Sequence, residues 1–163
     1  MEYLNIGRYV NTHGIKGEIR LLSTFRYKSK VFKPGFKFYI GKEKLEYEVE
    51  SYRPHKNFDM FIFKDIHDIN QIEHLKGSFV YINKEDLILD KNEYLAIDLI
   101  GFDAIIDDKL VGKVTDVIDT PANEVLRIND DILVPYVKEF IKDVDINNKK
   151  VNINNVKGLI SWK

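Results

Sequence analysis

Short strand-like segments separated by turn residues fill the first half of the chain, and this pattern favours a small β-barrel. Within each segment, apolar and polar residues alternate with the period of two that is expected of a strand with one buried face. The predicted strands cover residues 3–10, 18–23, 36–40, 45–49, 58–63 and 79–82. One helix is predicted over 68–76, where Asp68 and Gln71 have the spacing of a capping box, and residues 26–33 are predicted to be a polar connection. Six strands with one helix are typical of a closed or nearly closed barrel.

The second half returns to short strands after a charged stretch. Residues 84–92 contain five charged side chains, so the domain boundary is predicted there. We expect an N-terminal domain over 1–85, a linker over 86–92 and a C-terminal domain over 93–163. Further strands are predicted over 101–106, 110–118, 124–128, 132–134 and 151–153, with turns at 107–108, 120–123, 129–131 and 145–148 and one helical turn over 136–141. The expected fold class is mainly all-β, with two small β-barrels and one or two short helices.

The most distinctive predicted turn joins the first two strands. Gly14 and Gly17 permit a tight reversal, and Lys16 lies at its tip. Glu18 and Arg20 share one face of the returning strand. Taken alone, this stretch indicates a basic hairpin, for which a solvated tip is the commoner explanation.

Charge is distributed unevenly although the net charge of the chain is −1. Residues 1–85 hold 15 lysines and arginines against 11 aspartates and glutamates, a net charge of +4, whereas residues 86–163 hold 10 against 15, a net charge of −5. Within residues 8–37, eight basic side chains are opposed only by Glu18. Such a segment attracts a polyanion, and the acidic half suits a basic protein. By composition alone, a merely solubilising role for the lysines is equally acceptable.

Gly7 and residues 13–20, His-Gly-Ile-Lys-Gly-Glu-Ile-Arg, closely resemble the opening signature of the RimM family of ribosome maturation factors. Further matching segments follow in the family's order and approximate spacing at residues 31–35, 73–77, 98–101 and 110–114, at Asn123 and at 134–136. This ordered series covers nearly the whole chain. The resemblance implies an N-terminal six-stranded barrel related to those of translation factors and a C-terminal PRC-type barrel.

The resemblance also implies a function. A member of this family is expected to act in the cytoplasm without enzymatic activity, to bind precursor small ribosomal subunits, and to assist assembly and rRNA processing of the head region. Its acidic C-terminal barrel would contact a basic ribosomal protein of that head. We expect a monomer with no cofactor. The alternative from another class is a protein-interaction module whose PRC-like half docks on a protein and whose basic hairpin never touches RNA.

The candidate RNA-binding residues surround the predicted hairpin and the basic stretch after it. They are His13, Gly14, Lys16, Gly17, Arg20, Arg26, Tyr27 and Lys28. Lysine and arginine suit phosphate oxygens, and an exposed Tyr27 would stack on an unpaired base, whereas Phe32 is expected to pack under the barrel. His13 either hydrogen-bonds the turn, which we favour, or contacts RNA directly.

The candidate residues for binding a ribosomal protein come from the second half and rest on the resemblance. They are Tyr94, Leu95, Asp98, Asn123 and Pro135. RimM proteins usually carry two tyrosines and a tryptophan before the Asp-Leu-Ile-Gly run, whereas this chain keeps only Tyr94 and has Leu95 and Ala96 at the other positions. Tyr94 is equally suited to packing between the domains.

Several classes of chemistry are disfavoured by the sequence. The chain has no cysteine, so a disulfide, a thiol nucleophile and a thiolate metal site are excluded. Its four histidines lack metal-ligand spacing, and Gly35 with the Gly41-Lys42 pair fails the spacing of a phosphate loop. The longest apolar run is four residues, far short of the ~20 needed to cross a bilayer. The amino-terminal residues have no pattern of a secretory signal.

Overall fold

The computed structural model describes residues 1–120 and 123–155, and the chain divides into two compact units, Met1–Ile88 and Leu89–Lys163. Strands predominate in both units, which confirms the prediction of a mainly β chain. The predicted turn at 120–123 lies partly outside the described residues. In the described part of the chain, no helix is long and apolar enough to span a membrane.

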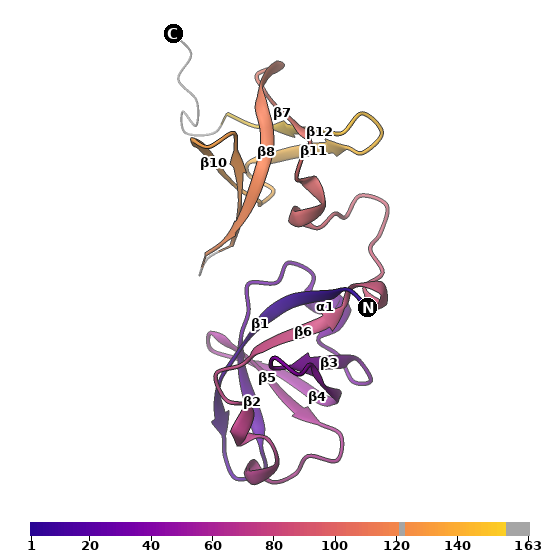
Figure 1. The fold of residues 1–163 in the computed structure, drawn as a ribbon, viewed down its shortest axis with the longest axis vertical. Coiled ribbons are helices and arrows are strands. Elements are labelled where there is room, and N and C mark those ends of the chain that lie inside the picture. Colours follow the sequence, from indigo (N-terminus) through magenta and orange to yellow (C-terminus); the bar gives the residue numbers. More distant parts are fainter. Residues whose placement is uncertain (121–122, 156–163) are drawn as a thin grey trace. The chain divides into compact units, whose positions relative to one another are not determined.

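The N-terminal unit is a closed barrel of six strands (Figure 1). The strands are β1 (Tyr3–His13), β2 (Glu18–Leu22), β3 (Lys37–Ile40), β4 (Leu45–His55), β5 (Phe58–Phe63) and β6 (Phe79–Asn83). Their order around the barrel is β1-β2-β5-β4-β3-β6, and every neighbouring pair is antiparallel. All six predicted strands are therefore present.

Alternation along the strands places the large apolar side chains inside this barrel. Tyr9, Phe38, Phe61 and Phe63 are fully buried, and the Phe38 and Phe61 rings meet edge to face with centroids 4.9 Å apart. Burying each such side chain contributes about 1.5–3 kcal/mol to folding. The predicted core position of Phe32 is confirmed, since it is 4% exposed.

Short helical segments connect the strands, and two of them differ from the sequence prediction. The predicted polar connection over 26–33 contains one turn of helix, α1 (Lys28–Val31). The predicted helix over 68–76 is wrong, because the segment forms two separate 3₁₀ turns, η1 (Ile69–Gln71) and η2 (Glu73–Leu75). The capping box of Asp68 and Gln71 is present nevertheless.

The spacing of apolar residues explains this difference. Ile69, Ile72 and Leu75 are three positions apart, which is the repeat of a 3₁₀ helix rather than of an α-helix. Ile72 is fully buried and has a φ angle of −131°, so it interrupts the helix where it enters the barrel core. A third 3₁₀ turn, η3 (Lys84–Asp86), follows β6.

The C-terminal unit is a sheet of six strands in the order β10-β9-β8-β7-β12-β11 (Figure 1). It begins with the 3₁₀ turn η4 (Ala96–Leu99). The strands are β7 (Asp103–Ile106), β8 (Lys109–Asp119), β9 (Glu124–Ile128), β10 (Ile132–Pro135), β11 (Ile141–Asp145) and β12 (Lys150–Ile153). The β7–β12 pair is parallel and the others are antiparallel. Its core includes Leu99, Leu126 and Val134.

Strand β11 is missing from the sequence prediction. Lys142 and Asp143 are exposed at its centre, so the apolar alternation that identifies the other strands is broken there. A bulge between Ile141 and Asp143 adds to the irregularity. The predicted helical turn over 136–141 corresponds to a single turn in which the N–H of Ile141 bonds the carbonyl of Val137 at 3.0 Å.

Candidate nucleic-acid interface

The turn between β1 and β2 is fixed by contacts with the η1 segment. Gly14 and Gly17 have φ angles of +74° and +84°, which glycine adopts at the least cost. The carbonyl of Ile15 accepts a hydrogen bond of 2.8 Å from the N–H of Ile69. A Cβ atom on Gly17 would lie 3.2 Å from the Asp68 carbonyl oxygen, so the two backbones approach closely. The exposed side chain of Lys16 therefore projects from a braced loop.

Glu18, the first residue of β2, is paired with Arg53 on β4. The Arg53 Nε and Nη2 atoms donate hydrogen bonds of 2.9 and 2.7 Å to the two carboxylate oxygens. These bonds hold the pKa of Glu18 below its ordinary value. Burial of the carboxylate raises the pKa in opposition, and the charges of Arg53, His13 and His55 lower it further. Glu18 is only 9% exposed, although it lies on the outer side of the strand. The sequence pattern gave no indication of Arg53.

Arg20 lies on the same strand and is held by two partners. Its Nη2 atom is 3.0 Å from Nδ1 of His13, and its guanidinium carbon is 5.8 Å from the ring centroid of Phe58. The interpretation that His13 hydrogen-bonds the turn is corrected, because its ring bonds Arg20 on the returning strand instead. This occurs because β1 and β2 pair antiparallel up to His13, which is in register with Glu18.

A second histidine approaches from β4. The rings of His13 and His55 have centroids 6.5 Å apart, and His55 is the last residue of β4. We refer to His13, Arg20, Arg53 and His55 as the His–Arg cluster. His13 lies on β1, Arg20 on β2, and Arg53 and His55 on β4. Strands β1 and β2 are neighbours in the barrel, and β5 lies between β2 and β4. In the sequence, the basic run at residues 53–56 is the signal that marks His55.

The candidate residues in and before α1 are more engaged in packing than the sequence suggests. The expectation of an exposed Tyr27 is wrong, since it is 8% exposed with its ring edge-on to Phe25 at 6.3 Å. A tyrosine between two basic residues can still bury its ring because the ring is largely apolar. The Nζ atom of Lys28 lies 2.8 Å from the carboxylate of Asp59, which is 5% exposed. Arg26 is exposed, with its guanidinium carbon 5.9 Å from the Tyr27 ring.

In the C-terminal unit, Tyr94 is partly buried against the core. Its hydroxyl donates to the Lys91 carbonyl at 3.1 Å, and its own carbonyl accepts a bond of 2.8 Å from the Tyr136 hydroxyl. Leu95 is 6% exposed, so its prediction as a surface contact is corrected. Asp98, three residues further along the chain, is exposed within η4. It is therefore the polar candidate for a surface contact in this segment.

Asn123 and Pro135 lie close together in this unit. Pro135 is in register with Val125 on the neighbouring strand, two residues from Asn123. The N–H of Asn123 bonds the Thr120 hydroxyl at 3.2 Å. Tyr136 links this end of the sheet to Tyr94, since its N–H bonds the Glu124 carbonyl while its hydroxyl bonds the Tyr94 carbonyl. The structure thus brings three of the five candidates into one neighbourhood.

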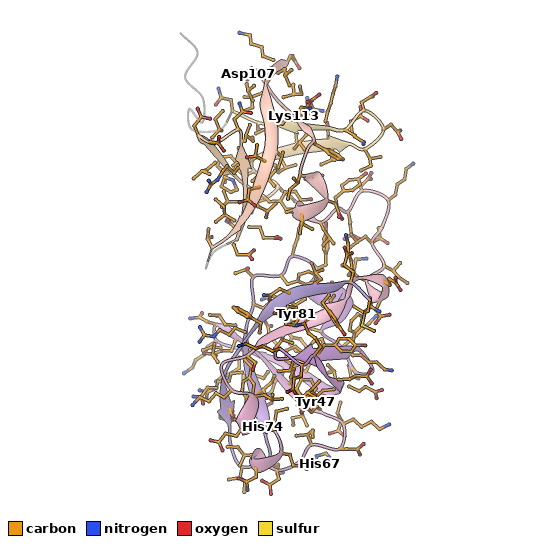
Figure 2. The ribbon with its side chains drawn as sticks, viewed as in Figure 1. Tyr47, His67, His74, Tyr81, Asp107 and Lys113 are labelled. Atoms are coloured by element: carbon orange, nitrogen blue, oxygen red, sulfur yellow. The ribbon has the colours of Figure 1, made fainter. Side chains whose placement is uncertain are left out.

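Across residues 1–120 and 123–155, no group of three or more histidine, aspartate or glutamate side chains is arranged to hold a metal ion. Exposed His67 and His74, labelled in Figure 2, belong to the segment around η1 and η2.

Comparison with known proteins identifies the family. Residues 4–87 match the RimM N-terminal domain, and residues 96–159 match the RimM PRC barrel domain. The ribosome maturation factor RimM of Staphylococcus aureus strain NCTC 8325 is 39% identical over 165 residues, covering 96% of this chain and 98% of the relative. The chain belongs to the RimM family. The N-terminal RimM match includes the whole His–Arg cluster, and the PRC match begins at η4.

Solved RimM structures are also similar to the chain. The N-terminal domain of RimM from Thermus thermophilus has 19% identity and a TM-score of 0.47, covering 55% of this chain and 98% of that domain. A RimM protein from Pseudomonas aeruginosa has 19% identity and a TM-score of 0.43, covering 94% of this chain and 97% of that chain.

Proposed function

We propose that this chain is a non-enzymatic, cytoplasmic and monomeric factor that binds precursor small ribosomal subunits and assists maturation of the head. The N-terminal barrel contacts rRNA, and the C-terminal unit contacts a basic ribosomal protein. Binding energy alone is sufficient for this role, because a factor that binds one arrangement of RNA and protein more tightly shifts the population toward it. The family relationship supports a function in ribosome maturation.

The observation that carries the RNA contact is the arrangement of cations around the β1–β2 hairpin. Lys16 projects from a loop that is braced by the Ile15–Ile69 hydrogen bond, and Arg20 is oriented by His13 and Phe58. A preorganised cation loses little conformational entropy when it binds a phosphate group. An arginine fork and a lysine point charge are both suited to phosphate oxygens.

The protein contact rests on the charge and geometry of the C-terminal half. Residues 86–163 carry a net charge of −5, which is complementary to a basic ribosomal protein. Tyr94, Asn123 and Pro135 gather around Tyr136, and Asp98 is exposed in η4. We assign this neighbourhood as the contact for the ribosomal protein.

Co-sedimentation with purified ribosomal subunits tests the proposal. The full chain is mixed with precursor small subunits, mature small subunits and large subunits at several salt concentrations. We expect binding that favours the precursor and weakens as salt rises, because phosphate contacts release counterions. Absence of binding to either small-subunit form would contradict the proposal and favour the protein-interaction module.

A charge-reversal pair tests the hairpin directly. K16E/R20E is expected to weaken binding to the precursor by at least about tenfold and to flatten the salt dependence, because two phosphate contacts are lost. The matched control is K42E/K76E, which makes the same change in net charge at two exposed lysines on the turns flanking β3 and β6. Equal effects of the two pairs would mean that general charge, rather than the hairpin, controls binding.

A further inference from the structure

We propose that His13, Arg20 and His55 form a binding site for one phosphate group of RNA, and that binding of the phosphate is coupled to protonation of the two histidines. This inference rests on the proposed RNA contact and specifies its chemistry. It begins from the convergence of three side chains on one outer patch of the barrel. His13 bonds Arg20 at 3.0 Å, and the His13 and His55 ring centroids are 6.5 Å apart.

The charged groups around this patch leave it positive. The carboxylate facing the two histidines is Glu18, and both of its oxygens are engaged by Arg53. The turns that end β1 and β4 add Lys16 and Lys56, which are exposed. The adjacent strand β5 contributes the uncharged side chain of Phe58 at the Arg20 guanidinium. Because the internal ion pair neutralises Glu18, the remaining charge is available to an external anion.

Arg20 has donors that protein groups leave unused. One Nη2 hydrogen is directed to His13, and Nε is buried without a hydrogen-bond partner among the described residues. A guanidinium group has five N–H donors, so the Nη1 hydrogens and the second Nη2 hydrogen remain for a ligand. Since the Phe58 ring lies against the guanidinium group, and this contact does not depend on the charge of His13, these donors are preorganised for phosphate oxygens.

The hydrogen bond between Arg20 and His13 supplies the link to protonation. Arginine is only a donor, so His13 accepts this bond through an unprotonated Nδ1. When His13 gains a proton, Nδ1 becomes a donor and the two groups repel each other. A phosphate placed between them accepts from both and removes the repulsion. His55, close to His13, gains the same stabilisation when it is protonated.

The coupling has a definite sign. A bound phosphate favours the positively charged form of both imidazole rings, so binding takes up protons. Affinity therefore rises as the pH falls through the range in which histidine changes charge, between about pH 8 and about pH 6.

Binding of a short fluorescein-labelled uridine RNA to the full chain tests the inference. Fluorescence anisotropy at constant ionic strength measures the affinity from about pH 8 to about pH 6. The wild type is expected to bind about tenfold more tightly at the lower pH, the gain expected when binding adds one charge-assisted contact. H13N/H55N is expected to lose most of this gain, because asparagine cannot take up a proton although it still offers an acceptor to Arg20.

The matched control is H67N/H74N. These histidines are exposed and lie in the segment that braces the same hairpin, so the variant removes two titrating groups from the same region without touching the cluster. It is expected to keep the wild-type pH dependence. An unchanged pH dependence in H13N/H55N, or its loss in H67N/H74N, would overturn the inference.

A second measurement needs no substitution. Inorganic phosphate is titrated into the wild-type chain while the histidine ring protons are observed by nuclear magnetic resonance. The His13 and His55 signals are expected to move toward the protonated position, and those of His67 and His74 to stay. Equal movement of all four would contradict a specific site. RNA binding without pH dependence would overturn only the histidine coupling, whereas absence of subunit binding in the co-sedimentation experiment would overturn the proposed function itself.

Discussion

Glu18 and Arg53, which are 35 positions apart in the sequence, form a two-pronged ion pair on the outer face of the N-terminal barrel. Glu18 belongs to β2 and Arg53 to β4, and β5 lies between these strands. The pair thus spans three strands and keeps a carboxylate neutralised beneath a basic surface. Its contribution to stability and to pH dependence can be measured.

Replacing Glu18 by glutamine is expected to destabilise the folded chain at neutral pH by about 1–2 kcal/mol, because charge-assisted hydrogen bonds are lost. The folded-state pKa of Glu18 lies below its ordinary value of 4.5, so its stabilisation is present above that value and is lost as the pH falls through the folded-state pKa. The difference between wild type and E18Q should therefore shrink as the pH falls below 4.5. Urea denaturation across this range measures it; a constant difference would contradict the assignment.

Replacement by alanine is expected to be tolerated better at Gly14 than at Gly17 in the hairpin turn. Both have positive φ angles, so alanine at either costs about 1 kcal/mol in backbone energy. Only Gly17 faces a close backbone neighbour, Asp68, whereas a Cβ on Gly14 meets nothing within 4 Å. G17A should therefore lower the thermal midpoint more than G14A, which serves as its control. Equal midpoints would show that η1 does not brace the turn.

Asp59 is expected to anchor α1 to the barrel. It accepts a hydrogen bond of 2.6 Å from the Tyr52 hydroxyl and pairs with Lys28 at 2.8 Å. D59A removes both contacts and should cost about 2 kcal/mol, whereas Y52F removes one and should cost about 1 kcal/mol. Denaturation gives both values. If D59A were no worse than Y52F, Lys28 would not contribute to holding the segment.

Asp98 is expected to contribute to the contact with the ribosomal protein. D98K should weaken binding of the full chain to the purified basic protein of the small-subunit head by about fivefold to tenfold, because a like charge replaces a complementary one. D130K is the control, since Asp130 is exposed in the turn at the opposite end of the β9–β10 pair from Asn123 and Pro135. Calorimetry measures both affinities, and equal weakening would remove Asp98 from the contact.

Local sequence signals account for most of the strands but not for the cluster. The alternation of apolar and polar residues and the flanking turn residues can be recognised within a single stretch of sequence. The predicted bounds of β5 and β9 therefore agree with the observed ones. The meeting of His13 with His55 depends on which strands become neighbours around the barrel, and no local pattern encodes that order. The Glu18–Arg53 ion pair also depends on the strand order, so no local sequence pattern predicts it.

Errors at single residues have a different origin. Tyr27 is expected at the surface because of its basic neighbours, and Leu95 is a contact candidate because of the family resemblance, yet each buries its side chain. The polarity of adjacent residues does not determine exposure where the backbone leaves regular secondary structure, because side-chain directions there follow no simple period. Strand β11 is absent from the sequence prediction because its exposed charged residues and its bulge conceal the pairing with β12.

The closed order of the first barrel has a consequence during synthesis of the chain. Strand β1 pairs with β2, which follows directly, but its other edge pairs with β6, so Tyr3 meets Asn83. Until β6 has left the ribosomal exit tunnel, the nascent chain carries an unpaired β1 edge, which is a template for aggregation. In the second unit, β7 likewise receives its parallel partner only when β12 emerges. The closed barrel therefore completes its pairing only with β6, and a chain terminated before that strand would expose an open edge that proteolytic quality control can recognise.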